Sequence, residues 1–192
     1  MAICMSRFRG VFLLIELTPK VLNVKINKNS RRKIIMAIEK VREYMKLYGR
    51  EKDILEFDVS SATVELAAQA IGCEGARIAK TLSFKLPNDE VILIVAAGDA
   101  KVNNSKYKQT FEAKAKMLQF DEVEPLIGHA VGGVCPFAVN DGVKVYLDES
   151  LHRFDYVYPA CGSANSAIKL TIPELEQLSN MDSWVDVCKL PE

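Results

Sequence analysis

The chain has 192 residues, of which 25 are Lys or Arg and 25 are Asp or Glu, so its formal net charge is zero. This length allows one domain that buries a core without disulfides or a metal, and 49% hydrophobic with 26% charged residues excludes a disordered chain. Neutrality also argues against a general nucleic-acid coat protein, which would be strongly basic.

The neutral balance conceals two segments of opposite charge. Residues 1–35 contain eight Lys or Arg and one Glu, a net charge of +7, so residues 36–192 carry −7. The apolar run from Val11 to Ile15 ends at Glu16. It is shorter than the roughly 7–15 residues of a signal-peptide core or the roughly 20 of a membrane span. We therefore expect no export signal and no membrane segment, and a cytoplasmic location.

Three interpretations of the basic segment 1–35 stay open. The alternation in Val21–Asn27 fits a strand of a β-hairpin, and the charge fits a basic arm that binds RNA. Alternatively, Arg31-Arg32-Lys33 stands two codons before Met36, and purine-rich codons for these residues would resemble a ribosome-binding site. In that case translation begins at Met36, and residues 1–35 are an extension of the reading frame.

The first half of the domain predicted over residues 36–192 alternates helices with strands. Helices are predicted over about Ile38–Tyr48 and Val64–Ile71, a short turn over Gly75–Ala79, and strands over Thr81–Phe84 and Val91–Ala97. Gly49 would end the first helix, and Thr63 and Gly72 would cap the second. The continuous apolar run Val91–Ala97 is typical of a central strand that is buried on both faces.

The second half continues the same alternation. A third helix is predicted over about Ser105–Leu118, strands over Val131–Val134, Val143–Leu147 and Ala167–Leu170, and a last helix to about Leu178. Asn140-Asp141-Gly142 between two strands predicts a hairpin turn. Thr171 and Glu174 form a capping box that opens the last helix. The whole pattern predicts a single mixed α/β domain.

Two stretches combine residue types that are suited to ester chemistry. Lys80 precedes Thr81 at the mouth of an apolar strand, where it could anchor a phosphate or an ester oxygen. Gly132-Gly133 permits close backbone approaches, and Pro136 fixes the exit of that loop. Such a loop can aim N–H groups at a developing oxyanion, although a tight loop without activity has the same sequence.

Other features have a structural and a functional interpretation. Gly162-Ser163 suits an anion, a substrate hydroxyl or a plain turn. The five Lys against one Glu over Lys101–Lys116 suit phosphates or a solvated face. Cys135 with His129 suggests a thiol hydrolase, although no third member that would orient the pair is visible. Five widely spaced Cys and two His lack the paired spacing of metal ligands, so no metal site is expected.

Five segments, in this order, resemble the YbaK/EbsC family, also called the prolyl-tRNA-synthetase-associated or editing domain. The segments are Ser61–Ala68, Ile78–Leu82, Val95–Asp99, Gly132–Phe137 and Tyr146–Leu151. The similarity extends from about Met36 to Leu178, and residues 1–35 have no counterpart. It implies a strongly curved, barrel-like mixed β-sheet flanked by helices.

The resemblance also implies a free-standing enzyme that hydrolyses the ester of mischarged aminoacyl-tRNA in trans, without a metal or cofactor. The family's catalytic Lys and Gly-x-x-x-Pro loop map onto Lys80 and onto Gly132, Gly133 and Pro136. The family loop more commonly has Ser before its Pro, so Cys135 bears on which amino acid is removed. A small amino acid on proline-type tRNA is expected, with prolyl-tRNA synthetase as a candidate partner.

Substrate contacts are expected from a wider set of residues around these two features. Those expected to contact the aminoacyl end are Thr81, Val134, Cys135, Asp148, Gly162 and Ser163, and those expected to contact tRNA phosphates are Lys101, Lys106 and Lys108. The competing interpretation is a non-catalytic module that binds tRNA or a synthetase.

Overall fold

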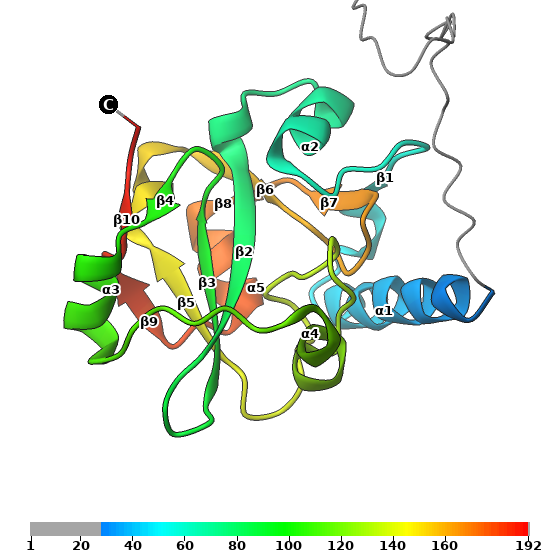
Figure 1. The fold of residues 1–192 in the computed structure, drawn as a ribbon. Coiled ribbons are helices and arrows are strands. Elements are labelled where there is room, and N and C mark those ends of the chain that lie inside the picture. Colours follow the sequence, from blue (N-terminus) through cyan, green and yellow to red (C-terminus); the bar gives the residue numbers. More distant parts are fainter. Residues whose placement is uncertain (1–27, 192) are drawn as a thin grey trace, which may run out of the picture.

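A six-stranded sheet forms the centre of the computed structural model, which describes residues 28–191 (Figure 1). In spatial order its strands are β8 (Leu170–Thr171), β6 (Tyr156–Pro159), β2 (Ile78–Lys85), β3 (Val91–Ala97), β5 (Lys144–Asp148) and β9 (Ser183–Val185). The β2/β3 and β6/β8 pairs are antiparallel, whereas β2/β6, β3/β5 and β5/β9 are parallel. The predicted curved mixed sheet in a single α/β domain is thereby confirmed.

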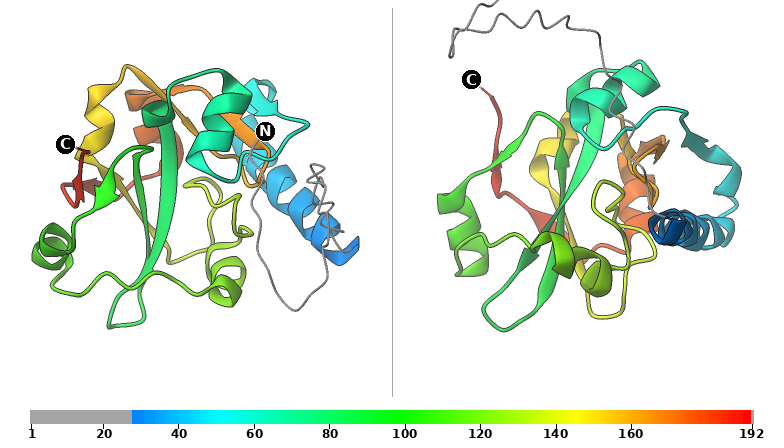
Figure 2. Two further views of the ribbon diagram at one scale, coloured as in Figure 1. Left: turned by 45° about the horizontal axis from the view of Figure 1, so that its top comes forward. Right: turned by 45° about the vertical axis from the view of Figure 1, so that its right-hand side comes forward.

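Two small sheets and a set of helices complete the domain (Figures 1 and 2). The small sheets pair β1 (Ile54–Glu56) with β7 (Ser166–Ile168), and β4 (Lys101–Val102) with β10 (Cys188–Lys189). The α-helices are α1 (Lys28–Lys46), α2 (Val64–Ile71), α3 (Asn104–Phe111), α4 (Phe120–Ile127) and α5 (Ile172–Ser179). Short 3-10 turns are η1 (Glu51–Asp53), η2 (Gly75–Arg77) and η3 (Glu149–Arg153).

Elements with strong local signals agree with the sequence predictions. The Thr63 hydroxyl accepts the Leu66 N–H at 3.3 Å and opens α2, and Gly72 ends that helix with φ of 76°. In α5 the Thr171 and Glu174 side chains each accept the other residue's backbone N–H, as a capping box requires. Strand β3 is buried from Ile92 to Ala97, as its unbroken apolar sequence predicts.

Two helix predictions need correction, and a further helix was not predicted. Helix α1 begins at Lys28 and ends at Lys46, whereas the prediction placed it over Ile38–Tyr48. Helix α3 ends at Phe111 because Glu112 adopts a left-handed conformation with φ of 52°. The prediction missed α4 because Pro125, which disfavours a helix interior, stands in its second turn.

The prediction of a strand over Val131–Val134 is wrong. This segment is a loop in which Gly132 has φ of 91°, and that conformation interrupts a strand. The hairpin predicted at Asn140-Asp141-Gly142 is also wrong, because among the described residues no strand directly precedes this turn and β5, which follows it, pairs in parallel with β3 and β9.

The predictions for the basic segment fall largely outside the described residues. Residues 1–27, including Val21–Asn27, are not described, and the backbone of α1 passes through Met36. Within residues 28–191 no helix has the length and hydropathy that a bilayer span requires.

Candidate functional site

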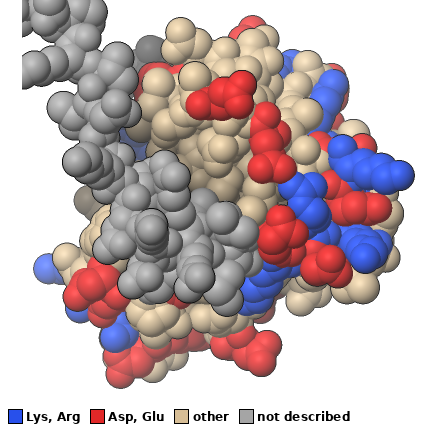
Figure 3. Space-filling model, turned by 90° about the vertical axis from the view of Figure 1, so that its right-hand side faces the viewer, with Lys and Arg blue, Asp and Glu red and all other residues tan. Residues whose placement is uncertain are grey.

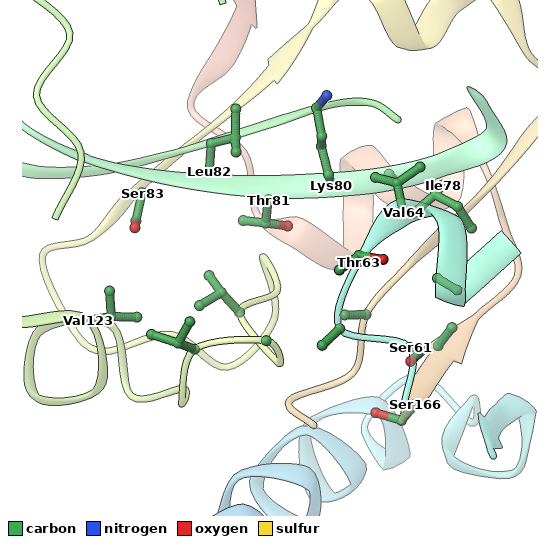
Figure 4. Close-up of a pocket in the computed structure, with 18 of the residues that line it drawn as sticks. Ser61, Thr63, Val64, Ile78, Lys80, Thr81, Leu82, Ser83, Val123 and Ser166 are labelled. Carbon is green, nitrogen blue, oxygen red and sulfur yellow. The ribbon is translucent and has the colours of Figure 1, made fainter. Parts of the chain in front are cut away.

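A cavity of about 560 Å³ lies at the edge of β2, where this strand separates from β6 (Figure 4). Strand β2 pairs with β6 only at Ile78 and Ala79, whereas its other edge pairs with β3 as far as Lys85. The stretch of β2 from Lys80 to Ser83, beyond the pairing with β6, therefore lines the cavity. The opposite walls come from the start of α2, the start of α4 and the loop around Gly132. Its volume falls within the range of small-ligand sites.

The polar groups of the cavity are mainly hydroxyls. The hydroxyl-bearing residues that line it are Ser61, Thr63, Thr81, Ser83, Tyr158 and Ser166. Among the described lining residues there is no Asp, Glu, His or Cys, and Lys80 is the one charged side chain. Thr81 Oγ1 is buried and has no hydrogen-bond partner within residues 28–191. A buried hydroxyl without a partner is energetically unfavourable, so a ligand group that bonds to Thr81 would relieve that cost.

Lys80 lines the cavity, but its ammonium group is bound to the backbone. Its Nζ donates to the Gly98 carbonyl at 2.9 Å and to the Ala100 carbonyl, so it fixes the turn after β3. Figure 4 shows the Lys80 and Leu82 side chains on one face of β2, with Thr81 and Ser83 on the other, as the period of a strand dictates. Burial lowers the pKa of Lys80, and this effect is partly opposed by Cys188 and Asp99.

The two loop glycines serve different purposes. Gly132 lines the cavity in a left-handed conformation, and its N–H has no acceptor among the described residues. The Gly133 N–H instead donates to the Ala130 carbonyl at 3.0 Å. A Cβ on Gly133 would lie 2.7 Å from the Ser163 N and Cα atoms. Gly132 therefore offers a free donor, and Gly133 allows the loop to lie against the backbone at Ser163.

Cys135 and His129 are packed together in the core behind this loop. The Cys135 Sγ lies 3.6 Å from His129 Nε2, but that nitrogen lies 2.8 Å from the Phe137 carbonyl oxygen. A carbonyl only accepts, so Nε2 carries the proton and cannot act as a base toward the thiol. Burial raises the pKa of Cys135 to about 12 and lowers that of His129. This geometry argues against a thiol hydrolase.

Replacing Cys135 with Ser should leave deacylation within about threefold of wild type, because the thiol is buried away from the cavity. Rates measured with the same mischarged tRNA test this expectation. Complete loss of activity in a folded Cys135→Ser protein would instead favour the nucleophilic thiol.

The other sequence-predicted residues divide between the cavity and its surroundings. Val134 lines the cavity, whereas Pro136 borders a separate hollow beside Tyr44 and Tyr48. Buried Ser163 lies behind the wall, with its Oγ 2.7 Å from the Ser166 Oγ. The Cβ position of Gly162 lies 2.8 Å from the Ala37 carbonyl oxygen on α1.

Asp148 lies away from the cavity and has a structural environment. It is almost fully buried, and its carboxylate accepts the N–H groups of Ser150, Val187 and Cys188 at 3.0 Å. These bonds fix the C-terminal segment to the end of β5. The three lysines predicted to contact phosphates also lie outside the cavity lining, and Lys106 pairs with Asp186 at 2.6 Å.

Sequence reasoning missed several lining residues. Ser61 stood inside a segment that carried the family resemblance, yet the prediction gave it no role. Tyr158 alternates with buried Val157 and Pro159, so strand periodicity alone would have placed it outward. Ser166 and the exposed rim residue Phe120 have no local signal in the sequence, because folding alone brings them to the cavity.

The chain is similar to one family model, one protein sequence and several solved structures. The profile of the aminoacyl-tRNA editing domain matches residues 59–178. The chain is 54% identical over 154 residues to the uncharacterized protein YwhH of Bacillus subtilis (strain 168), covering 80% of this chain and 98% of that protein. The crystal structure of a candidate trans-editing enzyme for prolyl tRNA synthetase is similar with a TM-score of 0.71 and 27% identity, over 80% of this chain and 97% of that one. The hypothetical protein APE2540 is similar with a TM-score of 0.69 and 27% identity, over 78% and 99% of the two chains.

Proposed function

The chain belongs to the aminoacyl-tRNA editing domain family, and from this premise we propose that it is a deacylase that hydrolyses mischarged aminoacyl-tRNA in trans. The observation that carries the proposal is one cavity that joins the β2 edge at Lys80 and Thr81 to the Gly132 loop. The largely apolar lining suits a small amino-acid side chain. We propose proline-type tRNA as the carrier, with prolyl-tRNA synthetase as a partner in the cytoplasm.

The residues of the cavity suggest how the ester is bound. The Gly132 N–H, which has no acceptor in the described part of the chain, would donate to the ester carbonyl oxygen as negative charge develops on it. Thr81 Oγ1 would bond to the substrate and so gain the partner that it lacks. We assign Lys80 to the terminal nucleotide, where its ammonium group would exchange a carbonyl partner for a phosphate or sugar oxygen.

The lining includes no carboxylate or imidazole among the described residues, so we assign water activation to the substrate itself. The hydroxyl next to the ester on the terminal ribose would orient a water molecule toward the carbonyl carbon. The water oxygen forms the new C–O bond, the ester C–O bond breaks, and the departing ribose oxygen takes up the proton. If the amino acid is cysteine, its own thiol would attack the carbonyl carbon in place of water: a C–S bond forms, the ester C–O bond breaks, the thiol proton passes to the departing ribose oxygen, and a thiolactone is released.

The pH dependence of deacylation should follow the loss of the proton from the Lys80 ammonium group and the ionisation of no other cavity group. Burial lowers the pKa of Lys80 below that of an ordinary lysine, so the positive charge of Lys80 is lost at a less alkaline pH than usual. After correction for spontaneous ester hydrolysis, kcat/KM should fall on the alkaline side, without an acidic limb near pH ~6–7. Single-turnover rates from acidic to alkaline pH provide the measurement, and a bell-shaped profile centred near neutrality would contradict this scheme.

Incubation with a panel of mischarged tRNAs tests the function directly. Loss of the ester from one aminoacyl-tRNA pair, catalysed by the wild-type chain and not by Lys80→Ala, would support a deacylase and identify its substrate. Tight binding without ester loss across the panel would instead indicate a non-catalytic module.

A further inference from the structure

A strip of aromatic and cationic side chains extends from the cavity along β6. Tyr158 lines the cavity, and Tyr156 stands two residues earlier on the same side of the strand. Their rings meet edge to face with centroids 5.8 Å apart. Both rings are partly exposed, whereas Val157 between them is buried. Accessible aromatic surface therefore continues beyond the cavity.

Two cations are held against Tyr156. The Arg77 guanidinium carbon lies 4.4 Å from the ring centroid, and its Nη1 donates to the Tyr156 carbonyl at 3.2 Å. The Lys169 Nζ lies 3.9 Å from the same centroid. A ring quadrupole attracts a cation without neutralising its charge. Tyr156 thus fixes two positive charges at the end of the strip while leaving them available to a ligand.

Among the described residues, neither of these two cations is neutralised by an acidic partner. Within the part of the chain that the structure describes, neither Arg77 nor Lys169 forms an ion pair, whereas Arg153 pairs with Asp99 at 2.5 Å. On the face shown in Figure 3, basic side chains alternate with acidic ones beside a broad uncharged area. Residues 36–192 carry a net charge of −7, so an anionic polymer needs a local cation site of this kind.

We propose that the strip of Tyr158, Tyr156, Arg77 and Lys169 binds the single-stranded 3′ end of an RNA whose terminal nucleotide occupies the cavity. The inference rests on the proposed function for the identity of that nucleotide. Single-stranded RNA presents bases that stack on aromatic rings and phosphates that attract cations, and the strip offers both in continuity with the cavity. Binding of the 3′ end is thereby assigned to this strip in place of Lys101, Lys106 and Lys108.

Fluorescence anisotropy with a short, non-aminoacylated single-stranded RNA that ends in CCA tests the strip. Because this probe carries no ester, the result does not depend on deacylase activity. The variant Arg77→Gln/Lys169→Gln should raise Kd about tenfold and should lower the salt dependence of log Kd by roughly 1.4, which corresponds to two phosphate contacts. Lys169 is exposed, so Lys169→Gln alone should fold, and we expect it to raise Kd about threefold.

Two control variants show whether RNA binding depends on positive charge at positions 77 and 169 or on the net charge of the protein. Lys52→Gln/Lys189→Gln removes two exposed positive charges elsewhere and should leave Kd unchanged, whereas Arg77→Lys/Lys169→Arg should bind as wild type. An unchanged Kd in both Lys169→Gln and the double variant, or no binding by wild type, would overturn the proposal. If the double Gln variant lost wild-type binding to a Glu-rich peptide but kept its RNA binding, the result would overturn the proposal in favour of a protein partner.

A second arm separates this inference from the proposed function. The double Gln variant should hydrolyse an aminoacyl-adenosine without phosphates as fast as wild type. If wild type hydrolyses no ester while the RNA result holds, the deacylase proposal fails and the binding strip stands.

Discussion

Replacing Lys80 with alanine should lower kcat for deacylation by about 100-fold or more, the scale observed when one preorganised electrostatic group is removed from an active site. Lys80 is the single charged side chain among the described residues of the cavity wall. The removal of its charge should therefore affect the bound nucleotide more than any other cavity substitution. Single-turnover deacylation of the cognate mischarged tRNA measures the effect.

The same substitution should also reduce stability, because Lys80 has a structural role. Its Nζ is the donor to the Gly98 and Ala100 carbonyls, and both acceptors lose that partner in Lys80→Ala. A cost of about 1–3 kcal/mol in the free energy of unfolding is expected. The kinetic measurement should therefore be made at a temperature where circular dichroism shows the variant to be folded.

Lys85 provides a matched control on the same strand. Its ammonium lies 3.0 Å from the exposed Asp89 carboxylate, and the residue does not line the cavity. Lys85→Ala should keep kcat within about twofold of wild type and should have little effect on stability, because an exposed ion pair contributes little. Wild-type kcat in folded Lys80→Ala would remove Lys80 from the mechanism, and equal losses in both variants would point to a general effect of charge.

Local interactions made much of the fold predictable. Helix α2 has its cap at Thr63, and α5 has its capping box, within one turn of the first helical residue. Strand β3 needs only its own apolar composition to be recognised as a buried strand. These elements are specified by residues that are neighbours in the sequence, and for that reason a single sequence was sufficient to place them.

Features set by distant contacts were not predictable in the same way. The Asp148 carboxylate accepts hydrogen bonds from backbone N–H groups 39 and 40 residues further along the chain. Its polar character therefore did not indicate a substrate contact. Lys80 and Thr81 are adjacent in sequence, yet strand periodicity sends their side chains to opposite faces of β2 (Figure 4). The resemblance identified the residues near the cavity, but only the three-dimensional arrangement shows which atoms face it.

A large structural effect is expected at Gly133. A Cβ there would lie 2.7 Å from the Ser163 N and Cα atoms and 2.8 Å from the Gly162 carbonyl carbon. These are backbone atoms that cannot rotate away, so Gly133→Ala must push the loop off the Gly162–Ser163 segment. We expect a loss of about 3 kcal/mol in unfolding free energy, or roughly 6–12 °C in Tm. Because the neighbouring Gly132 N–H moves with the loop, kcat should also fall at least about tenfold.

Gly142→Ala separates this steric effect from backbone strain. Gly142 has φ of 84°, but no atom of the described residues lies within 4 Å of its Cβ position. Alanine there should therefore cost only about 1–2 kcal/mol of left-handed strain and should leave kcat unchanged. Thermal unfolding and deacylation measured on both variants distinguish the two causes. If Gly133→Ala were as stable and as active as wild type, the loop would not depend on its contact with Ser163, and its glycine pair would have no part in holding the oxyanion donor in place.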